Sequence, residues 1–307
     1  MNMTSNLPNL IAPGLSGCYK DEWKRDTGLD QYKQFVNIET SDQAYEEYTK
    51  TSGIGPAVEL TENQVIPTED IVGSGKLKIS QKTFGKAVEI SVQMWQDDLY
   101  GVVSRAGKLL AAAGKTAFAL QGFDLFNAGF VTTTRTTLDT LALFSAAHTL
   151  LNPSGLAPGN PTTFSNTATA ALGYDSLQAA IESFALSYDE QGFPSAITPK
   201  FLVVKSADMM LAEQLTSAGR GQYGVANNEV QPSAFTKITP VVCDWLTNTG
   251  QWLLLGAKAD HDLMMFIRMQ PILKHYDNPF TMGALFSTMG RCAVGHVVPN
   301  GVYSAKP

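Results

Sequence analysis

Three residues that hydrolases use lie close together in the middle of the chain. They are Asp139, Ser145 and His148, the types that serve as orienting acid, nucleophile and base. The surrounding sequence lacks the G-x-S-x-G turn, and a catalytic triad depends on a geometry that spacing alone does not show. We therefore interpret His148 as a structural histidine. A hydrolase that uses Ser145 and His148 is kept as a remote alternative.

Two short strings are similar to nucleotide-binding motifs. Residues 113–116, AGKT, match the end of a phosphate-binding loop, but Leu109 stands where that motif needs a glycine. The string also falls inside an expected helix, so we interpret Lys115 as a lysine on a solvated helix face. Residues 219–224, GRGQYG, match G-x-G-x-x-G but follow an expected helix, whereas the dinucleotide motif follows a strand. They are interpreted as a mobile loop.

The possible metal ligands have no diagnostic spacing. Residues 260–262, DHD, and 275–277, HYD, each lack a third partner at a typical distance, and we interpret both as solvated turns. Cys18, Cys243 and Cys292 are scattered, as expected for reduced thiols. The sequence thus predicts no catalytic residue, no cofactor and no metal.

Composition excludes several classes of function. The net charge of -6 gives no basic surface for tight nucleic-acid binding. Tyr45, Tyr48, Trp245 and Trp252 are not interleaved with Lys or Arg, which argues against a platform for single strands. No run of 18 apolar residues or signal peptide is found, so we expect a soluble, unexported protein without a membrane partner. Charged residues make up only 16%, against about 25% in typical domains, which favours extensive burial against neighbouring molecules.

A long apolar periodicity predicts the central element of the fold. Residues 95–128 have apolar side chains at helical spacing without proline, which predicts one helix. Asp97 and Asp98 suit its N-terminus. Gly101, Gly107 and Gly114 lower helix propensity by about 1 kcal/mol each, which indicates that another backbone approaches closely.

An extended two-stranded hairpin is predicted ahead of this helix, over residues 42–93. Its return strand alternates apolar and polar residues around Phe84, Val88 and Ile90, and its tip is expected at residues 67–75. A two-stranded ribbon is marginal in isolation, so it needs a partner surface. We expect the contacts with a neighbouring subunit to involve the following residues: Ile71, Lys76, Leu77, Ile79 and Phe84.

The remaining segments predict an α+β chain without βαβ alternation. Residues 1–41 are expected to form an arm rather than a core element. Helices are predicted at 176–188 and 207–217, and strands at 201–204, 238–243 and 252–255, the last two joined by a turn at 248–250. Residues 264–269 and 285–298 are expected to be extended.

The order of arm, long hairpin, spine helix and separate α+β region resembles tailed-phage major capsid proteins with the HK97-type fold. More specifically, the chain is similar to the Mu-like major head subunit (gpT) family. The strings that carry the resemblance are 96–101, 143–148, 166, 172, 176–180, 189–192, 199–204, 227–230 and 245–255.

The resemblance implies a structural protein and a division into parts. These are an N-terminal arm (1–41), a hairpin or E-loop (42–93), the spine helix and peripheral domain (94–171), an axial domain (172–256) and return strands (257–307). It implies hexamers and pentamers of an icosahedral shell in the virion, assembled in the host cytoplasm. A scaffolding protein and a portal would be partners. Double-stranded DNA inside would be contacted weakly and without sequence preference, which the modest acidity suits.

The alternative within the same fold is an encapsulin-like bacterial compartment, whose shell holds an enzyme cargo. Co-purifying nucleic acid or cargo protein distinguishes the two.

Overall fold

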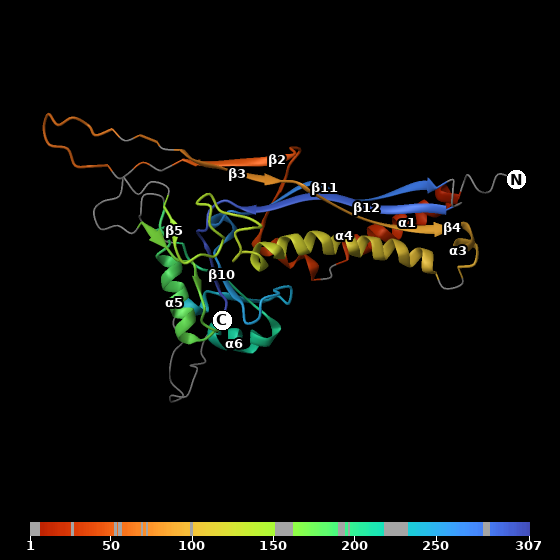
Figure 1. Ribbon diagram of the computed structural model, residues 1–307. Helices are drawn as coiled ribbons and strands as arrows, with labels where there is room; N and C mark the ends of the chain where they lie inside the picture. Colours follow the sequence, from red (N-terminus) through yellow and green to blue (C-terminus); the bar gives the residue numbers. More distant parts are fainter. Residues whose placement is uncertain are drawn as a thin grey trace. The chain divides into compact units, whose positions relative to one another are not determined.

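The computed structural model describes residues 7–25, 28–51, 54, 57–68, 70–71, 73–98, 101–150, 162–189, 194–195, 197–217, 233–278 and 283–307 (Figure 1). The chain forms two compact units that interleave along the sequence. Unit 1 contains residues 1–46, 79–122 and 264–294, and unit 2 contains residues 47–78, 123–263 and 295–307. Each unit is described by itself.

Unit 1 is built on a four-stranded sheet with the order β1-β11-β12-β4. Its strands are β1 (Asn37–Thr40), β11 (Leu263–Asn278), β12 (Gly283–His296) and β4 (Lys82–Ser91). β1 runs parallel to β11, and β4 pairs antiparallel with β12 over its full length, from Cys292 opposite Lys82 to Gly283 opposite Ser91. β1 and β4 are therefore the edges of the sheet.

Described residues of the segment 7–41 contribute to the core of unit 1, which corrects the prediction of an arm outside the core. α1 (Leu7–Lys24) places Leu15 and Tyr19 in a cluster with Leu110 of α4 (Val102–Asn127) and Phe286 of β12. The Tyr19 hydroxyl lies 3.0 Å from the carbonyl of Pro271 and 2.9 Å from Thr288 Oγ1. The short elements η1 (Leu29–Gln31) and α2 (Tyr32–Phe35) follow. Packing against a distant sheet thus sustains a helix that its own glycines and proline disfavour.

The predicted helix over 95–128 is divided. α3 (Val92–Gln96) ends early, and α4 begins at Val102 after Gly101, whose φ is +66°. The Val102 amide donates to Asp98 Oδ1 at 2.8 Å, so the expected acidic N-terminus is present at the start of α4. A left-handed residue cannot continue a right-handed helix, which explains the break.

The glycines inside α4 permit close packing, as the sequence predicted. A Cβ on Gly107 would lie 2.9 Å from Leu15 Cδ2 and 3.0 Å from its carbonyl oxygen. A Cβ on Gly114 would lie 3.0 Å from Pro271 and 3.2 Å from Thr288 Oγ1. These positions bring α1 and the sheet directly against the helix backbone.

The hairpin is shorter than predicted. Only β2 (Tyr45–Thr51) and β3 (Gly73–Ser80) form the two-stranded ribbon, with Lys76 Nζ 2.6 Å from Glu47 Oε1. Residues 82–91 are β4 and belong to the sheet of unit 1, which corrects the assignment of 42–93 to one hairpin. The alternating pattern was right, but it does not specify the pairing partner.

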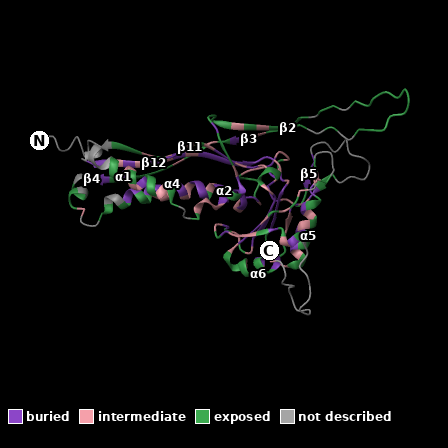
Figure 2. Ribbon diagram, turned by 180° about the vertical axis from the view of Figure 1, so that it is seen from behind, coloured by how far each residue is buried: buried purple, intermediate pink, exposed green. Residues whose placement is uncertain are grey.

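The described part of the loop between β2 and β3 turns at residues 61–64, not at the predicted 67–75. The Gln64 amide donates to the Thr61 carbonyl at 3.1 Å, and the Thr61 amide donates to Gln64 Oε1 at 3.0 Å. Asn63 has a φ of +64°, a conformation that Asn tolerates. Gly73 and Gly75 lie in β3 instead. The loop is exposed along its described length (Figure 2).

Unit 2 contains a five-stranded sheet with the order β7-β13-β10-β8-β9. The strands are β7 (Thr167–Ala168), β13 (Val302–Ala305), β10 (Trp252–Leu255), β8 (Phe201–Val204) and β9 (Thr239–Val242). The other elements of the unit are α5 (Tyr174–Ala185), η3 (Ser206–Asp208), α6 (Met209–Thr216), α7 (Ser233–Thr236), η4 (Lys258–Asp260), β5 (His148–Thr149) and β6 (Thr163–Phe164).

The core of unit 2 confirms most of the local predictions. Leu177 and Phe184 of α5, Ala212 and Leu215 of α6 and Trp252 of β10 form one buried cluster. The helices predicted at 176–188 and 207–217 and the strand at 201–204 are present. The turn near 248–250 is present too, but β8 lies between β9 and β10, so these two do not form a hairpin.

Candidate functional site

The Asp139–His148 pair is fully enclosed in unit 2. His148 is 0% exposed, and its Nδ1 lies 2.7 Å from Asp139 Oδ2. Its Nε2 lies 3.2 Å from the carbonyl oxygen of Leu143. Both ring nitrogens are therefore occupied by groups of the protein.

Ser145 has a different set of hydrogen bonds from this pair. Its amide donates to Asn166 Oδ1 at 2.9 Å, and its Oγ accepts from the Ala147 amide at 3.4 Å. Asn166 Nδ2 in turn donates to the Leu143 carbonyl at 2.7 Å, the group that His148 also contacts. A general base needs a nitrogen within reach of the nucleophile. The arrangement orders the loop that carries these residues, and it supports the interpretation of His148 as a structural histidine.

Asp139 is held in its charged form. Burial by itself raises the pKa of this carboxyl, but hydrogen bonds from His148 and Thr137 and the positive charge of His148 outweigh burial and lower the pKa. The Leu141 amide also donates to Asp139 Oδ1 at 3.1 Å. A buried carboxylate with this many donors acts as an anchor for the loop rather than as an acid that exchanges protons.

His296, at the end of β12, is a second buried histidine of unit 2. It is 2% exposed, and among the described residues neither ring nitrogen has a hydrogen-bond partner. Burial, with a smaller contribution from the Arg135 guanidinium, lowers the pKa of His296 to about 4, against the raising effect of Asp139. Arg135 itself pairs with Asp124 at 2.7 Å. His296 is therefore neutral at neutral pH.

The other sequence candidates are structural or lie outside the described residues. Lys115 is 7% exposed, which corrects its assignment to a solvated face. Its Nζ donates to the Arg25 carbonyl, lies 3.6 Å from Asp30 Oδ2 and sits 6.0 Å from the centre of the Trp23 ring. α1 and η1 cover the face of α4 that the sequence analysis had assigned to solvent. Residues 219–224 lie outside the described part of the chain.

The two possible metal motifs are not solvated turns. His261 is 4% exposed, and residues 275–277 lie within β11. Within the described ranges, no group of three His, Cys, Asp or Glu side chains could hold a metal ion, and no helix is long and apolar enough to cross a membrane.

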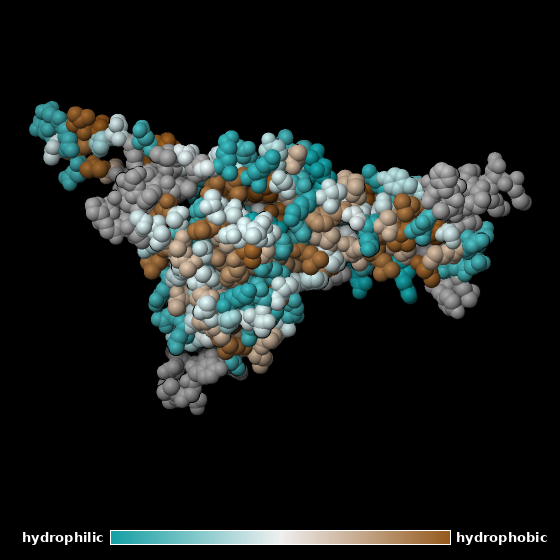
Figure 3. Space-filling view, viewed as in Figure 1, coloured by the Kyte–Doolittle hydropathy of each residue, from teal (hydrophilic) through white to brown (hydrophobic). Residues whose placement is uncertain are grey.

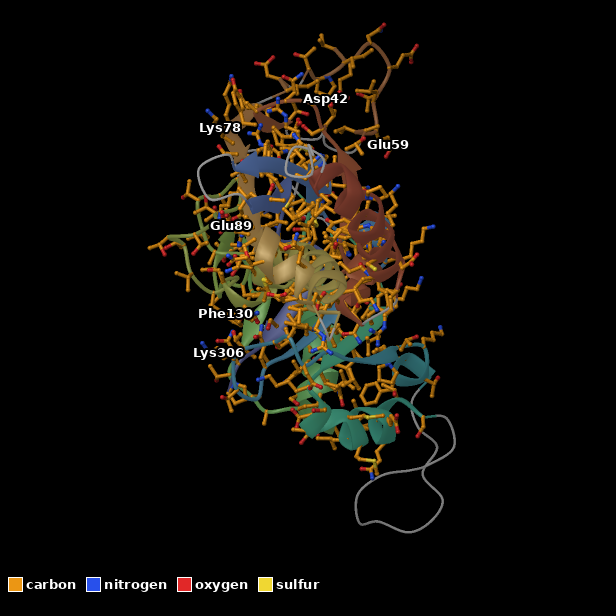
Figure 4. All side chains as sticks on the ribbon, turned by 90° about the vertical axis from the view of Figure 1, so that its right-hand side faces the viewer. Asp42, Glu59, Lys78, Glu89, Phe130 and Lys306 are labelled. Atoms are coloured by element: carbon orange, nitrogen blue, oxygen red, sulfur yellow. The ribbon has the colours of Figure 1, made fainter. Side chains whose placement is uncertain are left out.

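Trp245 stacks on Phe123 with ring centres 5.9 Å apart, and Trp252 is fully buried, so both serve the core of unit 2. Lys306 Nζ lies 5.5 Å from the ring centre of Phe130, near the chain end (Figure 4).

The five residues predicted for a subunit contact have different surroundings. Ile71 is 61% exposed at the end of the loop, and Lys76 is exposed on β3. Leu77 is half-buried, whereas Ile79 is buried by its own chain. Phe84 lies on β4, not on the ribbon, and packs edge-on against Phe118 with ring centres 6.5 Å apart. For Ile71, Lys76 and Leu77, the contact with a neighbouring subunit remains a prediction.

An open groove in unit 1 was not predicted from the sequence. It has a volume of about 200 Å³ and lies between α4 and the edge strand β4, over β11 and β12. Its lining is formed by the following residues: Phe84, Gly85, Lys86, Ala113, Gly114, Ala117, Phe118, Pro271, Thr288 and Gly290. Ala113 and Ala117 are one turn apart on α4, a small-residue pair that is the only sequence signal for a groove there.

Comparisons with known proteins agree on one class. The family model described as "Phage capsid protein" matches residues 75–303. No curated protein matches the chain significantly. Among solved structures, one from Microbacterium phage Oxtober96 has a TM-score of 0.58 at 12% identity and covers 92% of this chain and 93% of its own. The capsid of a native GTA particle has a TM-score of 0.60 at 10% identity, with 92% and 91% covered.

A third solved structure, the capsid of cyanophage P-SCSP1u, has a TM-score of 0.56 at 14% identity and covers 90% of this chain and 87% of its own. At these identities the structures show the fold, which is the HK97-like capsid fold, and the family match shows the family. Neither comparison distinguishes the Mu-like subfamily.

Proposed function

We propose how the shell assembles, starting from the finding that this chain belongs to the phage capsid protein family and is a major capsid protein that forms an icosahedral shell. The proposal is that its copies assemble as hexamers and pentamers in the host cytoplasm, with a separate scaffolding protein and a portal. The shell holds double-stranded DNA in the virion. The protein has a structural role and no catalytic activity.

The observation that carries the assembly proposal is the loop between β2 and β3. It exposes six large apolar side chains: Ile54, Val58, Leu60, Val65, Ile66 and Ile71. Val65 is 86% exposed. A monomeric protein rarely leaves so many apolar side chains uncovered in one segment. Figure 3 shows hydrophobic and hydrophilic residues alternating along this loop. Burial against neighbouring subunits resolves the exposure.

The proposed division of labour follows the family plan. The sheet, α1 and α4 of unit 1 act as the peripheral domain, and residues 172–256 of unit 2 act as the axial domain around hexamer and pentamer centres. The net charge of -6 supports weak, non-specific contact with the packaged DNA, because few cations are available to its phosphates.

Imaging tests the shell directly. We expect the purified chain, alone or co-expressed with the scaffolding protein, to elute from size-exclusion chromatography as large particles that are closed shells in negative-stain micrographs. Nucleic acid in particles from infected cells would distinguish the capsid from a compartment that holds an enzyme. A stable monomer under every condition, scaffold included, would contradict the proposal.

Limited proteolysis tests the contact proposed for the loop and its end at Ile71, Lys76 and Leu77. Residues 51–75 contain no Lys or Arg, and Lys76 and Lys78 lie in β3, so trypsin is unsuited to the loop. A glutamate-specific protease can reach Glu59 (Figure 4) and Glu62, which are exposed. We expect cleavage there in unassembled chains and protection in shells. Equal rates in both states would show that the loop does not dock between subunits.

A further inference from the structure

Helix α1 and the segment that follows it run alongside α4 in unit 1. A Cβ on Gly107 would lie 2.9 Å from Leu15 of α1. A Cβ on Gly122, further along α4, would lie 2.6 Å from Tyr32 of α2. Lys115, between these two glycines, is covered by the end of α1. Figure 4 shows the red helix α1 beside the yellow helix α4, on the same side of the blue strands.

The outward side of these helices, which we call the helix face, is basic although the whole chain is acidic. Its exposed charged residues are the following: Lys20, Asp21, Lys24, Arg25, Lys33, Arg105 and Lys108. Residues 7–35 and 102–122 together contain seven basic and four acidic side chains, a net charge of +3 in a chain whose net charge is -6. The net charge of the chain therefore conceals a basic surface in unit 1.

Most of the acidic side chains on this side of unit 1 are already paired. Glu22 lies 3.4 Å from Arg25. Asp30 lies 2.6 Å from Lys33 and 3.6 Å from the buried Lys115. Four cations of the helix face have no ion pair with any described residue: Lys20, Lys24, Arg105 and Lys108. Their charges are available to an anionic ligand.

The apolar and the basic residues of α4 are on different sides of the helix. Lys108 precedes Lys115 by two turns, so it projects toward the side that α1 occupies. Leu109 and Leu120 are exposed too, but their spacing puts them with Ala113, on the side of the groove. Over residues 13–25 and 28–35, no large apolar side chain is exposed. A protein partner would need an apolar centre in its contact, whereas phosphates need only cations.

The cations are spread over a length that suits a double helix. From Arg105 to Gly122, where the segment with Lys33 packs, α4 rises by about 25 Å. Double-stranded DNA has one phosphate for about every 3.4 Å on each strand, so about seven phosphates of a strand fall within this length. Flexible lysines meet such phosphates as point charges, without reading the bases.

We propose that the helix face is the surface of the subunit that contacts the packaged double-stranded DNA. Four side chains bind its phosphates: Lys20, Lys24, Arg105 and Lys108. The inference rests on the proposed enclosure of DNA in the shell, and it assigns that contact to one side of unit 1. Because the contact consists of charges that displace counterions, it is weak at high salt and has no sequence preference.

The salt dependence of DNA binding tests the proposal. The unassembled full-length chain and its variant Lys20→Gln/Lys24→Gln/Lys108→Gln are titrated into a fluorescent DNA duplex at several salt concentrations. Each phosphate contact contributes about -0.9 to the slope of log affinity against log salt, so the variant's slope is expected to be shallower by about 2.7. The variant Lys20→Arg/Lys24→Arg/Lys108→Arg keeps the charges and is expected to keep the slope. No binding by the unaltered chain at low salt would overturn the proposal.

A matched control removes the same charge elsewhere in unit 1. Lys82→Gln/Lys86→Gln/Lys274→Gln changes three exposed lysines of the strands β4 and β11 and is expected to leave the slope unchanged. Melting temperatures of all variants show that the fold is kept. Equal changes of slope in the two glutamine variants would show that DNA responds only to net charge, which would overturn the assignment to the helix face.

Imaging of the same variants, co-expressed with the scaffolding protein, separates this inference from the shell proposal. Closed shells together with the shallower slope would support both. An unchanged slope in the helix-face variant would overturn the DNA contact and leave the shell proposal standing. If that variant kept its slope but no longer assembled, the helix face would be a surface for the scaffolding protein, and the assignment to DNA would be wrong. A shallower slope in a chain that never forms shells would count against the shell alone.

Discussion

Unassembled chains are expected to lose stability steeply as the pH falls from about 6.5 to about 4. His296 and His261 are buried in unit 2, and burial lowers the pKa of each to about 4, from 6.5. The unfolded chain therefore binds these two protons at a higher pH than the folded chain. Stability rises with pH where the unfolded state binds more protons, so it is complete above pH 6.5 and falls below it.

The expected loss is about 3 kcal/mol for each histidine between pH 7 and pH 4. Urea denaturation at several pH values measures the free energy of unfolding. His296→Gln should remove about half of the pH dependence, and His275→Gln, at an exposed position of β11, should leave it unchanged. An unaltered slope in His296→Gln would contradict the assignment. The low pKa of Asp139 contributes only at lower pH, where its carboxyl takes up a proton.

His148→Ala is expected to destabilise the protein by about 3 kcal/mol, because it leaves the buried Asp139 carboxylate without the ring nitrogen that lies 2.7 Å from it. Ser145→Ala should cost less than about 1 kcal/mol, since its hydroxyl accepts only one long hydrogen bond. Urea denaturation at pH 7 compares the two variants. Similar losses of stability in the two variants would contradict a purely structural role for the Asp139–His148 pair. Loss of a hydrolytic activity in Ser145→Ala without loss of stability would revive the hydrolase alternative.

Local elements could be predicted from the sequence where one helix or strand determines its own pattern. The apolar residues of α5 recur at helical spacing, and Phe201 begins a short apolar run after Pro199, so both elements were predicted. α1 was largely missed because Pro13, Gly14 and Gly17 disfavour a helix, and only the distant sheet that buries Leu15 and Tyr19 compensates. Propensity is a weak prior that tertiary packing overrides.

Strand pairing and side-chain burial could not be predicted, because they also depend on distant parts of the chain. β4 has a clear alternation, but its partner β12 lies about two hundred residues further along the chain, and nothing in the pattern identifies it. Lys115 was assigned to solvent because helical periodicity shows which face is polar, not what covers it. The groove likewise depends on three strands and a helix that meet only in the fold. The Asp139–His148 contact was suggested by residue type, and its role became clear from its geometry.

The position of β13 has a consequence for protein synthesis. Residues 302–305 occupy an interior place in the sheet of unit 2, between β7 and β10. While the ribosome is still translating the residues before them, β10 lacks its neighbour on that side and unit 2 cannot close its core around Tyr303. Chains that stop early through a nonsense codon or a stalled ribosome therefore present an incomplete sheet. A polypeptide that stops before this strand is therefore expected to lack part of the unit 2 core.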